Sequence, residues 1–100
     1  MTRDDFIFTV GYQGNRAVID KTLKRRYSGK SAQALLQEGL YRQAFCAALY
    51  DSGNQQGGEG MAPVLAELSQ QFHRELDVES AKRLFGVHRI PEEIQKVLVL

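Results

Sequence analysis

The first twenty residues have the pattern of a short β-hairpin. Residues 6–10 (FIFTV) are mostly aromatic or β-branched, which favours a strand. Residues 11–15 (GYQGN) are typical of a five-residue loop, and Ala17–Ile19 would then be the return strand. Alternatively, residues 15–27 could form one helix with an apolar face. We favour the hairpin, followed by a helix that begins near Asp20.

The middle of the chain predicts two helices that meet at a glycine. Ser31 is a good N-cap for the first helix, and Gly39 suits the position just beyond its end. Residues 40–50 (LYRQAFCAALY) follow, and nine of these eleven residues are apolar or aromatic. A helix that is apolar nearly all round belongs inside a core. We therefore expect Leu40–Tyr50 to be the central helix of the fold.

A glycine-rich stretch separates this helix from the second half of the chain. Residues 51–60 (DSGNQQGGEG) contain four glycines and no apolar residue. This composition predicts a mobile loop. Each flanking half would have only about 40–50 residues, which is too few for an independent core. We therefore expect residues 1–100 to form a single small globular domain.

Three more helical patterns follow this loop. Pro63 suits the first turn of a helix whose apolar positions continue to Leu76. Asp77 can cap the next helix, which should stop at Gly86, and Pro91 would open the last one. The expected buried positions are Val64 or Leu65, Leu68, Phe72 and Leu76, then Ala81, Leu84 and Phe85, and finally Ile94, Val97 and Leu98. The whole pattern predicts a mostly helical α+β fold, with the N-terminal β-hairpin packed on a bundle of about five short helices.

Charge is distributed unevenly along the chain. The formal net charge is +1, but residues 1–50 carry eight Lys or Arg against four acids, and residues 51–100 carry five against eight. Residues 21–30 (KTLKRRYSGK) contain five cations and no acid. Such a run can contact phosphates without reading base sequence, although a solvated helix face has the same composition. The residues expected to contact an anion or nucleic acid are Lys21, Lys24, Arg25, Arg26 and Lys30, with Tyr27 available to stack on a base.

The helices around the two glycine turns do not complete a DNA-reading helix-turn-helix. The helix after Gly39 offers only Arg42 and Gln43 to base edges. In the second pair, Glu92 and Glu93 occupy the helix end that would enter a groove, where they would repel phosphates. Ordinary helical hairpins are therefore the favoured interpretation of both pairs.

The sequence shows no set of residues that would organise catalysis or bind a cofactor. Cys46 lies on the apolar helix, so we expect a buried, inert thiol. His73 and His88 are fifteen residues apart and do not form a zinc set with one cysteine. Residues 29–31 (GKS) resemble the end of a phosphate-binding loop, but Lys24 stands where that loop requires glycine. We expect no catalytic residue, no metal and no cofactor.

These observations favour a small non-catalytic intracellular protein-interaction module. The apolar run near the N-terminus is short and follows two aspartates, and no window has the roughly 20 apolar residues of a membrane span, so we expect a cytoplasmic protein. The hairpin edge and the loop at residues 51–60 could contact another protein or a second copy of the chain. The alternative is a nucleic-acid-binding accessory or regulatory protein that contacts phosphates through residues 21–30. An enzyme is the least favoured class.

Overall fold

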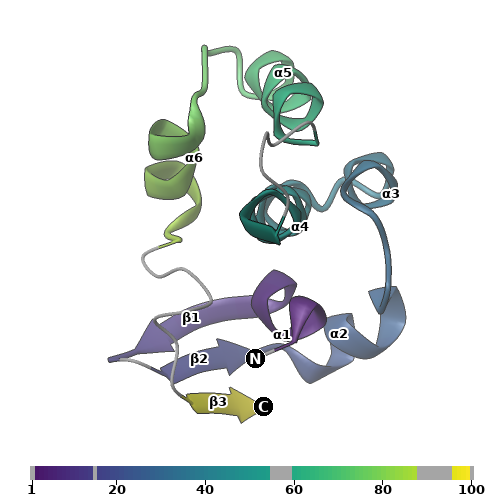
Figure 1. The fold of residues 1–100 in the computed structure, drawn as a ribbon, viewed down its shortest axis with the longest axis vertical. Coiled ribbons are helices and arrows are strands. Elements are labelled where there is room, and N and C mark those ends of the chain that lie inside the picture. Colours follow the sequence, from purple (N-terminus) through teal and green to yellow (C-terminus); the bar gives the residue numbers. More distant parts are fainter. Residues whose placement is uncertain (1, 15, 55–59, 88–95, 100) are drawn as a thin grey trace.

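The computed structural model describes residues 2–14, 16–54, 60–87 and 96–99, with backbone alone at 53–54 and 96–99 (Figure 1). In this part of the chain the helices are α1 Arg3–Ile7, α2 Lys21–Tyr27, α3 Ala32–Gln37, α4 Tyr41–Asn54, α5 Met61–Gln71 and α6 Val78–Phe85. The strands are β1 Thr9–Gln13, β2 Arg16–Ile19 and β3 Lys96–Val99. The predicted fold class, α+β and mostly helical with an N-terminal hairpin, is confirmed.

A short helix, α1, replaces the first half of the strand predicted at residues 6–10. Thr2 and Asp5 form a capping box, in which each side chain accepts a hydrogen bond from the other residue's backbone N–H (3.1 and 3.3 Å). Phe6 and Ile7 are therefore helical, and β1 begins only at Thr9. The strand prediction was wrong at Phe6, Ile7 and Phe8, because Phe8 is the C-cap of α1 and the cap at Thr2 outweighs the β-favouring side chains.

The hairpin itself is tighter than its sequence suggests. Gln13 pairs with Arg16, so the connection has two residues, and the predicted five-residue loop was wrong. Gly14 has φ of +62°, a conformation that glycine adopts without steric cost and that such short turns require. A bulge between Thr9 and Gly11 interrupts the β1–β2 register. The preferred interpretation of Ala17–Ile19 as a strand, and not as part of a helix, is confirmed.

The third strand, β3, corrects the prediction for the end of the chain. Val97 and Leu98 lie in a strand that pairs in parallel with β2, opposite Ala17 and Val18. The sheet order is β1-β2-β3, so β2 has a partner on each side. The expected helical face failed there because backbone pairing with a distant strand outweighs local periodicity. Pro91 and Ile94, the remainder of that prediction, lie outside the described residues.

Helix α4 is the central helix, as predicted (Figure 1). It lies between the sheet with α1 on one side and α5 on the other, while α3 packs along it. Its residues Ala44 to Ala48 are all buried. The helix continues to Asn54, so the prediction of a loop from Asp51 was wrong for residues 51–54. Ser52 Oγ donates to Ala48 O (2.6 Å) within the helix, and residues 55–59 lie outside the described part.

The boundaries of the other helices follow local signals, with exceptions near α5 and α6. Gly39 (φ +76°) follows α3, and Gly86 (φ +68°) ends α6, as predicted. Helix α5 ends at Gln71, because His73 adopts a left-handed conformation (φ +53°). The predicted helical face from Val64 to Leu76 is therefore interrupted: Leu76 is buried outside the helix, and Phe72 is half-exposed. Leu84, expected to be buried, is also half-exposed, since Ala81 and Val87 supply the buried side there.

Candidate anion-binding surface

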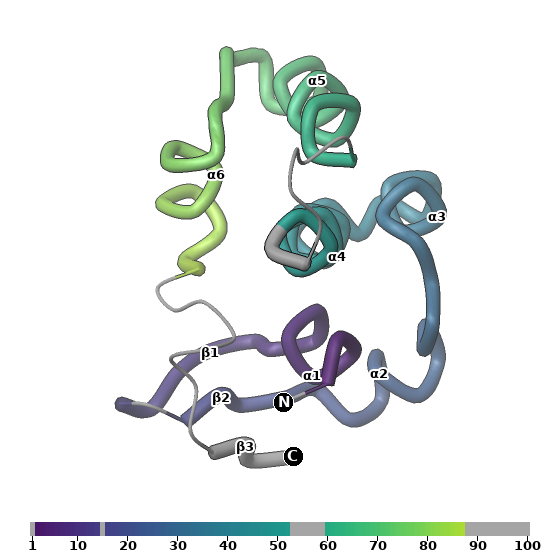
Figure 2. The backbone as a smooth tube through the Cα atoms, viewed as in Figure 1, coloured from purple at the N-terminus to yellow at the C-terminus, as the bar shows by residue number. Residues whose placement is uncertain are grey.

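Helix α2 carries most of the basic segment, defined here as residues 21–30. Asp20 Oδ1 accepts a hydrogen bond from Leu23 N (3.0 Å) and caps the helix. Leu23 and Tyr27 are half-buried and pack against the core. One face of α2 is thus turned inward, whereas Lys21, Arg25 and Arg26 are exposed. The helix lies beside α1 (Figure 2).

The basic segment does not present five equivalent cations. Lys21, Arg25 and Arg26 are exposed, and none of them forms an ion pair in the described part of the chain. Lys24 is half-buried, and Lys30 is exposed beyond the end of the helix. Lys21 and Arg25 are four residues apart and share one face, whereas Arg26 lies about 100° further round the helix.

An open depression of about 440 Å³ lies on this face, and we call it the α2 depression. It is lined by Lys21, Lys24, Arg25 and Ser28. Three of the predicted contact residues are therefore brought together. Tyr27 packs against the core, so its side chain is not presented for stacking with Lys21 and Arg25. Ser28, which directly follows the last residue of α2, was not among the predicted residues; its position four residues after Lys24 could have indicated it.

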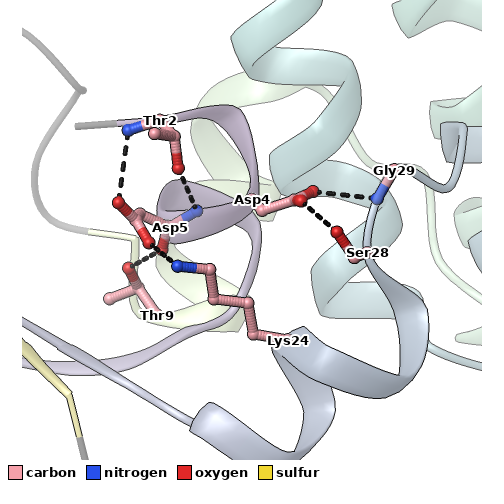
Figure 3. A network of polar contacts seen from close by, with 7 residues as sticks. All are labelled: Thr2, Asp4, Asp5, Thr9, Lys24, Ser28 and Gly29. Atoms are coloured by element: carbon pink, nitrogen blue, oxygen red, sulfur yellow. Dashed lines mark hydrogen bonds and ion pairs between the residues drawn. The ribbon is translucent and has the colours of Figure 1, made fainter.

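Two adjacent aspartates of α1 hold α2 in place, as Figure 3 shows. Asp5 Oδ1 forms an ion pair with Lys24 Nζ at 2.5 Å. Asp4 accepts hydrogen bonds from Ser28 Oγ (2.7 Å) and from Gly29 N (3.2 Å). Thr9 Oγ1 donates to the carbonyl of Asp5 (2.7 Å) and so connects this network to β1.

Opposing effects act on the Asp5 carboxyl. Burial by itself would raise its pKa, but hydrogen bonds from Lys24 and Thr2 together outweigh burial, and the pKa is lowered. Asp5 is therefore a carboxylate at neutral pH, and its charge balances that of Lys24.

Arg3 fixes the far end of the basic segment. Its guanidinium forms a bidentate pair with the Asp51 carboxylate of α4 (2.8 and 3.1 Å). Its Nη1 donates to the carbonyl oxygen of Lys30 (2.9 Å). The hydrogen bond to Asp51 outweighs the effect of burial and raises the pKa of Arg3. Helices α1 and α4 and the end of the basic segment are thus joined by one side chain.

The acids near α2 reduce the local positive charge. Asp4 and Asp5 contact the basic segment, and Asp20 caps its helix. Against the five cations of residues 21–30, these three carboxylates leave an excess of two positive charges. The surface can therefore attract an anionic group locally, but it is not the strongly basic face that the sequence run indicates.

Other residues considered for chemistry lie in different settings. Cys46 is buried as predicted, and burial raises the pKa of its thiol to about 11. His73 is exposed, and no group of metal-binding side chains occurs among the described residues. Arg42 donates to the carbonyls of Phe85 (2.9 Å) and Thr9, so its guanidinium joins α4 to α6 and β1 instead of facing a base. His88, Glu92 and Glu93 lie outside the described residues.

Two exposed apolar side chains, Val10 and Phe72, lie outside the basic segment. Val10, at the bulge of β1, is 49% exposed, and β1 is an outer strand of the described sheet. Phe72 makes edge-to-face contacts with Tyr41 and Phe85 and is partly open to solvent. These side chains are separate from the α2 depression, because none of them lines it.

Comparisons with protein-family models, with curated proteins and with solved structures gave no match. None of the described helices has the length and apolar character needed to cross a membrane.

Proposed function

We propose that this protein is a small non-catalytic interaction module that binds an acidic segment of a partner protein through the exposed basic face of α2. The observation that carries this proposal is the position of Lys21 and Arg25, which line one depression on a helix that Asp4 and Asp5 attach to α1. A fixed helix loses little entropy when it binds, which favours association. The single cysteine suits a reducing compartment, and we place the module in the cytoplasm.

The second candidate is a nucleic-acid-binding accessory protein. The open depression that collects Lys21, Lys24 and Arg25 favours it, because a phosphate backbone could lie across such a surface. We rank this function second because the local excess is only two positive charges. With about three phosphate contacts, the logarithm of the binding constant would fall only about 2–3 units per unit of the logarithm of salt concentration, which is typical of weak binding.

Binding of labelled probes, followed by fluorescence anisotropy at about 50 mM salt, tests both functions. The probes are a Glu-rich peptide and a DNA duplex of mixed sequence. The double variant K21E/R25E reverses the two exposed charges of the depression. The matched control R74E/R83E reverses two exposed charges of the α5–α6 region.

We expect the peptide to bind the wild-type protein and the control, and to bind K21E/R25E at least tenfold more weakly. Binding of the duplex without binding of the peptide would favour the nucleic-acid function. No binding of either probe would refute the proposed surface. The molar mass in solution is measured for the wild-type protein and for K21E/R25E. A dimer that the double variant abolishes would show that the acidic partner is a second copy of the chain.

A further inference from the structure

The α2 depression combines three cations with a hydroxyl group. Lys21 and Arg25 are four residues apart, as are Lys24 and Ser28, so two neighbouring pairs line the depression. A volume of about 440 Å³ lies within the range of small-molecule sites, but the depression is open. It is suited to a compact charged group that belongs to a larger ligand.

We infer that this depression is a binding site for a phosphate monoester carried on a phosphorylated side chain of the partner protein. This inference rests on the proposed function and specifies its ligand. A phosphate monoester carries nearly two negative charges at neutral pH and three strong acceptor oxygens, whereas a carboxylate carries one charge and two oxygens. Three cations around one depression therefore favour the phosphate more strongly than a glutamate.

The donors differ in how they would contact the phosphate. The guanidinium of Arg25 can donate two parallel hydrogen bonds to phosphate oxygens, and it makes no ion pair in the described part of the chain. Lys21 adds an exposed point charge from the preceding turn. These two side chains can therefore reorient onto the ligand without breaking an ion pair in the described part of the chain.

The other two donors are held by α1 before any ligand binds. Lys24 contacts Asp5 at 2.5 Å, and its ammonium has three protons, so it can keep this contact and still donate to a phosphate. Ser28 has one hydroxyl proton, which it now donates to Asp4. A phosphate that accepted the hydrogen bond from the Ser28 hydroxyl would replace Asp4 as its acceptor. Gly29 N would continue to donate to Asp4.

The carboxylates beside the depression set the strength of binding. Asp5 is balanced by Lys24, and Asp4 accepts two hydrogen bonds, so both charges are partly compensated. They still oppose a second anion nearby. The preference for phosphate should therefore appear as a ratio of the dissociation constants of two peptides, and neither peptide should bind very tightly.

The test compares three peptides that differ at one position, namely phosphoserine, glutamate or unmodified serine. Binding is followed by NMR chemical-shift titration of the ¹⁵N-labelled full chain at about 50 mM salt. The phosphoserine peptide should bind about tenfold tighter than the glutamate peptide, with the largest shifts at residues 21–29. Because the second phosphate pKa is about 6, this advantage should shrink between about pH 7.5 and about pH 5.

Variants of Arg25 separate charge from geometry. Arg25→Lys keeps the charge but removes the fork of donors, which both phosphates and carboxylates can accept. It should therefore weaken binding of both peptides, and that of the phosphoserine peptide more, so that the phosphoserine preference falls. Arg74→Lys is the matched control. Circular dichroism shows whether each variant is folded. Inorganic phosphate and an oligonucleotide that carries only internal phosphodiesters serve as further probes.

Each outcome decides between the proposals. Equal binding of the phosphoserine and glutamate peptides would overturn the phosphate inference and leave the proposed function standing. Absence of binding by both peptides would overturn both. Equal binding of phosphodiester and phosphoserine would replace the phosphoprotein ligand with a nucleic acid.

Discussion

At the scale of single residues, the neighbouring acids Asp4 and Asp5 determine how α2 is held. Successive side chains on a helix point about 100° apart, so the two carboxylates reach different parts of the basic segment. Asp5 contacts Lys24 within α2, and Asp4 contacts Ser28 and Gly29 beyond its end. The helix is therefore fixed at two points by one turn of α1.

The Asp5→Asn variant tests the energetic part of this attachment. Since the pKa of Asp5 is lowered on folding, its charge stabilises the protein above the unfolded pKa, and this contribution is lost as pH falls through the folded pKa. We expect D5N to lower the free energy of unfolding by about 1 kcal/mol at neutral pH. The difference from wild type should vanish in strong acid.

Urea unfolding followed by circular dichroism at several pH values measures this difference. Glu75→Gln, which neutralises an exposed acid, is the control and should follow the wild-type curve. A D5N effect that is the same at neutral and acidic pH would show that the ion pair is not its cause.

Cys46 gives a second prediction at this scale. With a thiol pKa of about 11, only about one part in a thousand is thiolate at about pH 8, and the side chain is 1% exposed. A thiol-specific disulfide reagent should therefore label the native protein far more slowly than the protein in concentrated urea. Absorbance of the released thiol measures both rates, and rapid native labelling would contradict the buried position.

At the scale of elements, local signals predicted helix ends better than strands. Gly39, Asp77 and Gly86 act within one or two turns of their own positions, so a single stretch of sequence identifies them. Strand β3 depends instead on β2, about eighty residues earlier, which no local pattern reveals. The strand prediction at Phe6 and Ile7 failed for a local reason, because the helix cap at Thr2 outweighed their β-favouring side chains.

The N-cap of α2 gives a prediction for this element. Asp20→Ala removes the acceptor for Leu23 N and should cost about 1 kcal/mol of stability. Asp20→Asn keeps a capping oxygen and should cost only about a few tenths of a kcal/mol. Urea unfolding midpoints compare the two variants. Equal losses in both would show that the carboxylate charge, and not the cap, stabilises α2.

At the scale of the whole molecule, tertiary contacts determine what the basic segment can bind. Its cations were evident from composition, and the structure places three of them on one depression. The acids that reduce their charge were not evident, because Asp5 lies nineteen residues from Lys24 and Asp4 lies twenty-four from Ser28. Hydrophobic patterning could identify α4 as the central helix, since burial on every side leaves an apolar sequence. Ion pairs between distant helices leave no comparable periodicity.

The last prediction concerns the sheet that joins the two ends of the described chain. Strand β2 pairs with β1 on one side and with β3 on the other, so a chain that stops at residue 95 would leave one edge of β2 unpaired. Loss of several backbone hydrogen bonds should lower the free energy of unfolding by about 2–4 kcal/mol. Hydrogen exchange measured by NMR should become faster at β2, while buried amides of α4 should speed up only as far as the loss of global stability requires. A chain that lacks only Leu100 is the control and should keep the wild-type exchange of β2. If the shorter chain retained that exchange as well, residues 96–99 would not be the partner of β2, and the parallel pairing would be refuted.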